Sequence, residues 1–373
     1  MGKDTFTRSA YADSVRMFAS TGGPATRRAE QKAHNTGKLH PLVDPAEYGV
    51  IRRSLPRFEQ LEPSKLYEMT VGTPMPVEIR VDTTGSMGGN VDVAIRVLPE
   101  TYELGCTVLP GYDLQMAIGI FGDVVDRFVL CRPQFEMVAE KLVEQLTLMV
   151  PERNGGDATE DPHYGLFGAA YLTDRYINRI GLKGYDFTVS DAPTREKLSP
   201  TQLTRIFGKE VFEKVAENGH QISKNDLPTA KEVVQDLLEQ AHAFFLQVEN
   251  DTWTSELWTK IFGPDRVVVL PSTQLLPQVQ AVIIGLTEGT LGLDEVTEFL
   301  KTNNVSADNA KRIVRSVANI PIGAQSALPN YGRRPKMGDL FREKTDPWPV
   351  NPEEVDLGSS DVVSESDEGP VWL

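Results

Sequence analysis

The chain has 373 residues, a net charge of −15 and a hydrophobic share of 40%. The acidic charge argues against a nucleic-acid surface and against binding to anionic membranes, while the apolar share is enough for a sizeable core. Only two cysteines are present, Cys106 and Cys131, so the sequence indicates no disulfide framework.

The sequence gives no sign of export. No apolar run follows Met1, so no signal peptide is visible. No apolar stretch is long enough to span a bilayer. Together with the scarcity of cysteine, these features lead us to expect a protein of the cytoplasm.

Residues 1–70 form the first predicted region, an N-terminal arm. Their composition is mixed, basic in places and rich in Ser, Thr, Gly and Pro, with little periodicity. Within the arm, residues 48–57 are expected to contribute one strand or to pack on the following domain. The arm is interpreted either as a loosely ordered leader or as a segment that docks a partner.

The most informative stretch is residues 76–88. Val77, Ile79 and Val81 predict a short strand, and Asp82 begins the loop that follows it. In that loop a carboxylate and two hydroxyls occupy every second position, at Asp82, Thr84 and Ser86, so all three point the same way in an extended backbone. Hard oxygens of this kind suit a small hard cation such as Mg²⁺.

Strands and helices alternate from residue 71 to residue 290. The predicted helices cover residues 91–104, which Pro99 is expected to kink or split, and then 135–146, 166–176, 199–215, 233–241, 253–261 and 275–286. The predicted strands cover residues 114–123, 127–131, 185–190, 243–248 and 266–270, with 127–131 pairing back on 114–123 as a hairpin. Two short helices, at 293–300 and 306–317, form a helical extension over 291–328, and 329–373 is predicted to be an acidic disordered tail.

Successive strand–helix units of this kind predict an α/β fold with a doubly wound, mostly parallel sheet and one antiparallel edge strand. Ligands of such sheets bind beyond the carboxyl ends of the strands. Asp82 and Asp191 each lie at the carboxyl end of a predicted strand, which places them at that edge.

Asp82-x-Thr84-x-Ser86 after an apolar strand resembles the metal-ion-dependent adhesion site of von Willebrand factor type A (vWA) domains. Two further segments match the other loops of that site. The segment 155–160, Gly-Gly-Asp-Ala-Thr-Glu, is similar to the family's second loop, and the strand that ends in Asp191-Ala192-Pro193 is similar to the third. The resemblance therefore implies a vWA-like domain over 71–290 whose metal ligands are Asp82, Thr84, Ser86, Asp157, Thr159 and Asp191.

The resemblance also implies a function. Mg²⁺, or Mn²⁺ in its place, would be held by the hydroxyls directly and by Asp82 and Asp191 mostly through water. Either Asp157 or Thr159 would supply the contact from the second loop, and the sequence leaves the choice open. Glu160 is interpreted either as a partner that supports the metal ligands or as an acid favoured at a helix start by the helix dipole, and we favour the second role. The partner would be a protein that offers a Glu or Asp carboxylate, with an AAA+ ATPase or a multiprotein assembly as one class that the family suggests, and no catalysis is expected.

Other functions fit the residues less well. An aspartic protease would need Asp-Thr-Gly-Ser, but an extra residue separates Asp82 from Gly85, and no second lobe is visible. A phosphotransferase of the haloacid-dehalogenase type would need a second Asp where Thr84 stands. A structural scaffold that holds no metal is the third alternative. Turnover would reveal either enzyme, and a failure to bind Mg²⁺ would favour the scaffold.

Overall fold

The computed structural model describes residues 26–249 and 251–351. Its centre is a six-stranded sheet in the order β10-β9-β8-β4-β5-β6. Every neighbouring pair is parallel except β5 and β6, so the predicted α/β fold with an antiparallel edge strand is confirmed. The strands are β4 (Thr73–Asp82), β5 (Tyr112–Phe121), β6 (Leu130–Cys131), β8 (Gly184–Ser190), β9 (Ala241–Gln247) and β10 (Val267–Val269).

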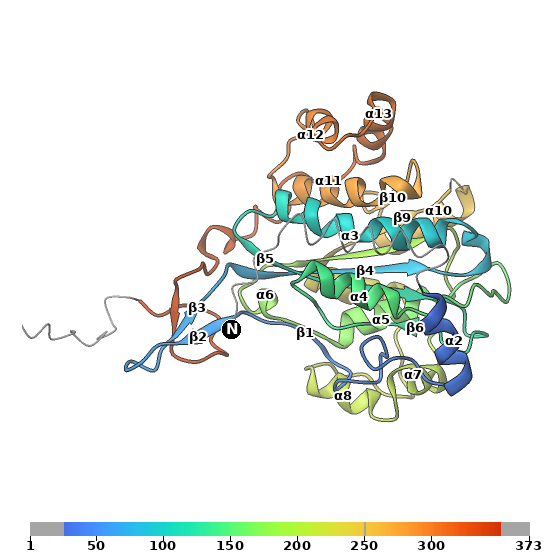
Figure 1. Cartoon of the computed structure of the whole chain (residues 1–373), viewed down its shortest axis with the longest axis horizontal. Helices are drawn as coiled ribbons and strands as arrows, with labels where there is room; N and C mark the ends of the chain where they lie inside the picture. The colour runs from blue at the N-terminus through green and yellow to red at the C-terminus, as the bar shows by residue number, and fades with distance from the viewer. Residues whose placement is uncertain (1–25, 250, 352–373) are drawn as a thin grey trace, which may run out of the picture.

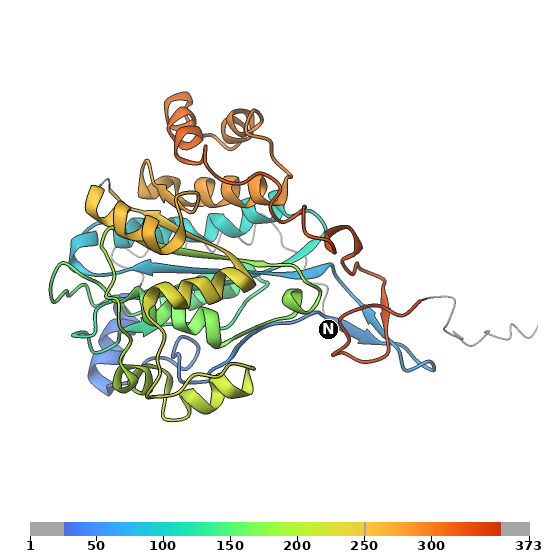
Figure 2. The ribbon, with the colours of Figure 1, turned by 180° about the vertical axis from the view of Figure 1, so that it is seen from behind.

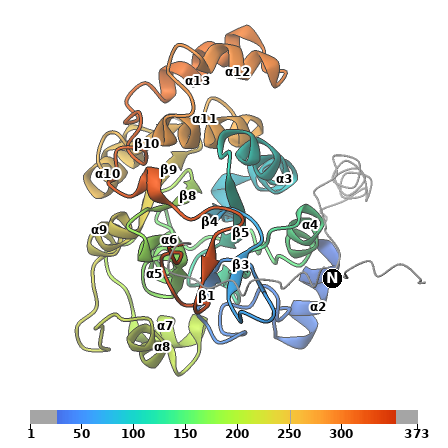
Figure 3. The same ribbon diagram turned by 90° about the vertical axis from the view of Figure 1, so that its left-hand side faces the viewer.

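Helices cover both faces of this sheet, as Figures 1 and 3 show. On one face lie α3 (Asn90–Val108), α4 (Ala139–Thr147) and α11 (Leu276–Glu288). The other face carries α5 (Pro162–Tyr171), α9 (Ala230–Gln240) and α10 (Thr252–Phe262), which Figure 2 shows from behind. Two further helices on that side are α7 (Pro200–Phe207) and α8 (Val211–Glu217).

Strand β4 is buried along its whole length because it is covered on both faces. Its alternate residues meet different surroundings. Val77, Ile79 and Val81 belong to the apolar core under α3 and α11. Glu78 and Arg80 point to the α5 side, where they join a buried network of charged groups.

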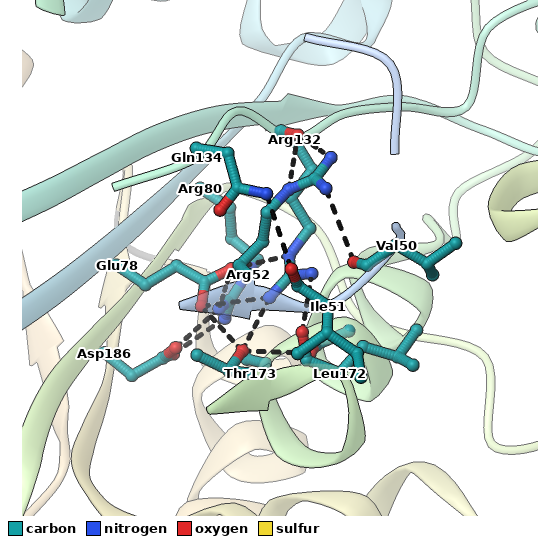
Figure 4. A network of polar contacts seen from close by, with 12 residues as sticks. Val50, Ile51, Arg52, Glu78, Arg80, Arg132, Gln134, Leu172, Thr173 and Asp186 are labelled. Carbon is teal, nitrogen blue, oxygen red and sulfur yellow. Dashed lines mark hydrogen bonds and ion pairs between the residues drawn. The ribbon is translucent and has the colours of Figure 1, made fainter. Parts of the chain in front are cut away.

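Figure 4 shows that network between the sheet and α5. The Arg80 guanidinium donates to both oxygens of Asp186, over 2.7 and 2.5 Å. Arg132 Nε donates to Glu78 Oε1 over 2.9 Å, and the other end of the Arg132 guanidinium donates to the Thr173 hydroxyl over 2.6 Å. Buried charges are tolerated when they are paired in this way, so this face of the sheet is organised by ion pairs as well as by apolar packing.

The order of the strands creates a switch point beside β4. From β4 the chain passes through α3 to β5 on one side, and later through α5 to β8 on the other side. Ligands of open α/β sheets bind at such a point, beyond the carboxyl ends of the strands. Asp82 ends β4, and Asp191 follows β8 directly.

The described part of the N-terminal region packs on this domain. Helix α2 (Arg27–Thr36) comes first, and β1 (Arg52–Ser54) then pairs in parallel with β7 (Thr173–Arg175). The expectation of one strand within 48–57 is therefore confirmed. Arg52 is buried beneath this pair and donates to the backbone oxygen of Arg132. Residues 1–25 of the predicted arm lie outside the described residues.

Three sequence predictions of helix boundaries were wrong. Pro99 does not split the helix, since α3 continues through it from Asn90 to Val108. The helix expected over 166–176 ends at Tyr171 and is followed by β7 and the short α6 (Tyr176–Arg179), because the buried Thr173 side chain bonds to Arg132. The helix expected over 199–215 is divided into α7 and α8 at Gly208, whose φ of 89° suits glycine.

The C-terminal region also departs from the sequence prediction. Residues 329–351 are not a disordered tail, since they contain the turn η3 (Tyr331–Arg333) and β11 (Leu340–Phe341). β11 joins β2 (Phe58–Gln60) and β3 (Tyr67–Met69) in a small antiparallel sheet. Apolar contact explains the difference, because Phe341 is fully buried and its ring lies 5.0 Å from that of Phe58. Residues 352–373 lie outside the described residues.

Before that segment, α12 (Val296–Thr302) and α13 (Ala307–Ser316) lie on the outer side of α11, as Figures 1 and 3 show. Both helices were expected from the sequence. Val296, Leu300 and Ile313 are buried and belong to the same apolar cluster as the residues of α11. Across the described ranges, none of the helices has the length and apolar character needed to cross a membrane.

Candidate metal centre

The candidate site begins where β4 ends. Asp82 is fully buried, and both the backbone N–H and the hydroxyl of Thr84 donate to its Oδ1, over 2.8 and 2.7 Å. The Ser190 hydroxyl donates to its Oδ2 over 2.5 Å. The Ser86 hydroxyl lies 3.3 Å from that of Thr84 and donates to Asp191 Oδ1 over 2.9 Å. Oxygen atoms from two neighbouring strand ends therefore meet in one cluster.

Local backbone structure brings the first loop (82–88) into this shape. Thr83 is directed toward the end of β5 instead of toward the cluster. Both its N–H and its hydroxyl donate to the Phe121 carbonyl over 2.9 Å. The short helical turn η1 (Gly85–Met87) then presents Ser86 on the exposed side and buries Met87. Gly88 follows with a φ of 48°, which favours glycine.

Backbone hydrogen bonds tie the three loops together. Gly85 N–H of the first loop donates to the Asn154 carbonyl of the second loop (151–161) over 2.9 Å. Glu160 N–H of the second loop donates to the Pro193 carbonyl of the third loop (190–195), also over 2.9 Å. On the far side of the third loop, Trp258 Nε1 of α10 donates to the Ala192 carbonyl over 3.0 Å. The positions of all three loops are thus set by the protein itself.

Four of the six predicted ligands are joined in this cluster: Asp82, Thr84, Ser86 and Asp191. The other two lie elsewhere on the second loop. Asp157 is 62% exposed in its side chain, and its Oδ1 accepts from the Thr159 N–H over 2.8 Å and from Arg195 over 3.2 Å. Among the described residues, no hydrogen bond or ion pair connects Asp157 or Thr159 with the cluster. A metal contact from either one stays a prediction.

Glu160 is the acid of the second loop that faces the cluster. Its side chain is buried, and its Oε2 has no hydrogen-bond partner among the described residues. Burial, together with the negative charges of Asp82 and Asp123, raises the pKa of Glu160 to about 9, although a hydrogen bond with Thr84 acts in the opposite direction. The helix-start role favoured for Glu160 does not account for this burial, and its place beside Asp82 and Thr84 agrees with the alternative role, a partner of the metal ligands.

The other acids of the cluster also hold their protons more tightly than usual. Burial raises the pKa of Asp82 to about 6, although the hydrogen bonds from Ser190 and Thr84 offset part of that rise. Burial raises the pKa of Asp191 as well, and the nearby Glu249 carboxylate adds to the effect. The site thus concentrates acidic groups whose ionisation is disfavoured by burial and by one another.

Arg195 pairs with three acids near the cluster, and it lies to one side of the cluster. Its guanidinium contacts Asp123 over 3.1 Å, Asp157 over 3.2 Å and Asp161 over 2.7 Å. These pairs join the second and third loops to the end of β5. Neither Asp82 nor Glu160 is paired with Arg195, so Arg195 positions the loops without neutralising those two acids.

The residues of the cluster fit a small divalent cation. The orphaned oxygen of Glu160 and the mutual repulsion of Glu160 and Asp82 are the features that a bound cation would relieve. Across the described residues, no group of three or more His, Cys, Asp or Glu side chains is arranged to hold a metal ion. Ligation here would therefore depend on the hydroxyls of Thr84 and Ser86 together with carboxylates.

Sequence reasoning did not assign three residues of this neighbourhood. Asp123 follows the end of β5, so the rule that located Asp82 and Asp191 at strand ends would have found it as well. Ser190 is the last residue of β8 and lacks a comparable signal, because a serine in a strand has no single expected partner. Glu160 was noticed, but the role at a helix start was favoured over the role beside the metal ligands, because burial cannot be read from a loop sequence.

No protein-family profile and no curated protein sequence matches this chain. Several solved structures are similar in three dimensions at low identity. Proximal thread matrix protein 1 from the mussel byssus is 10% identical with a TM-score of 0.37, over 57% of this chain and 48% of that one. The same mussel protein has also been solved with zinc in its metal-ion-dependent adhesion site (MIDAS) motif.

A von Willebrand factor type A protein from Catenulispora acidiphila is 14% identical with a TM-score of 0.33, over 59% of this chain and 44% of that one. The pilus adhesin SpaC from Lactobacillus rhamnosus GG, in its open conformation, is 13% identical with a TM-score of 0.38. The match covers 62% of this chain and 33% of SpaC. The chain spans less than half the length of each of these proteins. Its similar structures thus include proteins of the vWA type.

Proposed function

We propose that this protein is a metal-dependent binding module that captures a carboxylate of a partner protein, and that it catalyses no reaction. The observation that carries the proposal is the convergence of Asp82, Thr84, Ser86 and Asp191 at the switch point of the sheet, beside the unpaired Glu160. Mg²⁺, or Mn²⁺ in its place, is the proposed cofactor, because small hard cations prefer oxygen ligands.

Each residue has a role in the proposed site. Thr84 and Ser86 offer hydroxyl oxygens, and Ser86 lies on the exposed side of its loop. Asp82, Asp191 and Glu160 supply negative charge, and Ser190 and the Thr84 N–H hold Asp82 in place. A bound cation would supply the positive charge that attracts a Glu or Asp side chain from outside. The partner is therefore a protein with an accessible acidic residue, and an AAA+ ATPase or a multiprotein assembly is the class we propose.

Cysteine chemistry agrees with a cytoplasmic location, which we also propose. Both cysteines are free thiols, Cys106 exposed and Cys131 buried. Burial raises the pKa of the Cys131 thiol to about 12, and desolvation by the groups around the Cys106 sulfur raises its pKa to about 11, although the residue as a whole is exposed. Thiols with such pKa values are poorly reactive, so neither is suited to redox chemistry.

Isothermal titration with Mg²⁺ and Mn²⁺ tests the metal site. The full chain should release or absorb heat, and Asp82→Ala and Ser86→Ala should lose it. Ser86 is exposed, so its variant carries little risk of misfolding. Ser326→Ala changes another exposed serine outside the site and should leave the titration unchanged. Heat from neither ion in the wild type would favour the metal-free scaffold.

Capture from native lysate, with Mg²⁺ or with EDTA, tests the partner. Proteins retained with Mg²⁺ should be lost in EDTA and with Asp191→Ala, because both remove the bridge to the partner's carboxylate. A set of captured proteins that is the same in all three conditions would contradict the proposal. Hydrolysis of a generic phosphate ester or peptide by the wild type, absent from Asp82→Ala, would favour an enzyme instead.

A further inference from the structure

A cavity of about 520 Å³ opens beside the candidate metal centre. It lies between the carboxyl ends of β9 and β10, the start of α3 and helix α13, and its volume falls within the ~300–1,000 Å³ typical of ligand sites. Two residues of its lining place the cavity near the centre. Asn90 lines it four residues after Ser86, and the N–H of Val248 in its wall donates to the carbonyl of Ser190, next to Asp191, over 2.9 Å.

Two arginines of α13 give this cavity a positive wall. Arg312 and Arg315 both line it and both are exposed. Arg312 is anchored, since its guanidinium donates to the Pro271 carbonyl over 2.6 Å. Arg315 has no hydrogen bond or ion pair with any residue in the part of the chain that the structure describes. Glu249 is the single acid in the lining.

The rest of the lining is polar and able to orient a ligand. Ser272 and Thr273 contribute hydroxyls, and the Thr273 hydroxyl donates to the Asn90 side chain over 2.8 Å. In a chain with a net charge of −15, two arginines in one cavity beside an acidic centre are a local reversal of sign. Guanidinium groups pair with carboxylates through two parallel hydrogen bonds, so the cavity is suited to a carboxylate.

We propose that this cavity is a second subsite for the same ligand, and that the ligand is an extended peptide segment with two acidic residues. One carboxylate binds at the metal centre, and the second, a few residues along the segment, enters the cavity and pairs with Arg315 and Arg312. This inference rests on the proposed function and adds specificity to it. A ligand with one carboxylate would bind only at the metal centre, whereas a segment with two acidic residues would bind at both subsites.

Fluorescence anisotropy with labelled peptides tests the proposal on the full chain in Mg²⁺. One peptide carries a single Glu in a Gly-Ser background, and a matched series adds a second Glu two to six residues further on. The best spaced double-acid peptide should bind about tenfold more tightly than the single-acid peptide, as expected for one charge-assisted pair. Arg315→Gln should abolish this advantage and leave binding of the single-acid peptide unchanged.

Lys311→Gln is the matched control, because it removes the same charge from α13 at an exposed position that does not line the cavity. It should retain the advantage of the double-acid peptide. Equal affinity of single-acid and double-acid peptides for the wild type would overturn the subsite and leave the proposed function intact. An advantage that persists in Arg315→Gln and in Arg312→Gln would also overturn it. If neither peptide binds, the proposed function and the subsite both fail.

Discussion

Glu160 and Asp82 are two acids that share a buried corner without a counter-charge. Such an arrangement destabilises the metal-free protein and creates affinity for a cation, because the same repulsion that weakens one state is relieved in the other. A substitution that removes the carboxyl group of Glu160 should therefore make the metal-free protein more stable and lower its affinity for a cation.

Glu160→Gln keeps the size of the side chain and removes its ability to ionise. We expect the free energy of unfolding in EDTA to rise by on the order of 1 kcal/mol, and the affinity for Mg²⁺ to fall about tenfold or more. Urea denaturation and isothermal titration measure the two effects. Glu256→Gln, at an exposed position of α10, should change neither, and a Glu160→Gln protein that behaves like this control would exclude a role for Glu160 at the site.

Glu288 is a second buried acid, located at the end of α11 and away from the metal centre. The Tyr185 hydroxyl donates to its Oε1 over 2.8 Å, and that of Tyr112 donates to its Oε2 over 3.4 Å. Burial raises the pKa of Glu288 from 4.5 to about 7. The folded state thus holds a proton that the unfolded state releases near pH 4.5, so this contribution to stability is complete below pH 4.5 and is lost as pH rises toward 7.

Glu288→Gln should flatten this dependence. Between pH 4.5 and 7 the wild type should lose at most about 3 kcal/mol more of its unfolding free energy than the variant does. Denaturation curves at several pH values in EDTA give the comparison, and the exposed Glu298→Gln serves as the control. Parallel pH profiles of wild type and Glu288→Gln would show that Glu288 does not keep its proton.

At the scale of elements, α5 approaches the charged layer of the sheet very closely. Gly165 and Gly168 face the sheet, and a Cβ added at Gly165 would lie 2.8 Å from Arg80 Cδ. At Gly168 it would lie 3.1 Å from Arg132 Nε. The two glycines therefore set the distance between α5 and the ion pairs beneath it.

Gly165→Ala should destabilise the protein by about 1–3 kcal/mol, because Arg80 is locked in its pair with Asp186 and cannot move aside. Helix propensity alone would predict a gain of nearly 1 kcal/mol for this change, so the sign of the measured effect separates packing from propensity. Gly332→Ala adds its methyl where no atom lies within 4 Å and should be nearly neutral in the same thermal or urea unfolding assay.

Sequence patterns predicted the long elements well and failed where buried polar groups decide. The strands that end in Asp82 and Asp191 were found because apolar runs and strand-end acids follow general rules. The break after Tyr171 was missed because apolar spacing continued through Tyr176, while the buried side chains of Thr173 and Arg175 impose a strand there. Pro99 did not divide α3, which shows that tertiary packing can override a local signal.

At the scale of the whole molecule, the chain segment 329–351 returns to the small sheet that precedes β4. The Tyr176 hydroxyl donates to the Pro347 carbonyl over 2.9 Å, and the Thr73 hydroxyl to that of Pro335 over 2.6 Å. Figures 1 and 2 show this segment beside β2 and β3, at the end of the molecule opposite the carboxyl ends of the central strands. Contacts between regions so distant in sequence are not predictable from local composition.

Phe341→Ala should free residues 329–351 from the small sheet that they form with β2 and β3. The lost burial and the cavity left behind should cost about 3 kcal/mol, and limited proteolysis should cut within 329–351 sooner than in the wild type. Metal affinity should be unchanged because the centre lies at the other end of the sheet. Met337→Ala, whose side chain is 72% exposed in the same segment, should be cut at the wild-type rate, and equal rates for both variants would contradict the role of Phe341.

The main-chain bonds from Gly85 to Asn154 and from Glu160 to Pro193 have a kinetic consequence. A receptor whose parts are assembled in advance needs no search through loop conformations when its ligand arrives, and it loses little chain entropy on association. The rate of ion uptake should then be governed by the exchange of water from the ion, and the apparent rate should increase linearly with ion concentration without reaching a plateau.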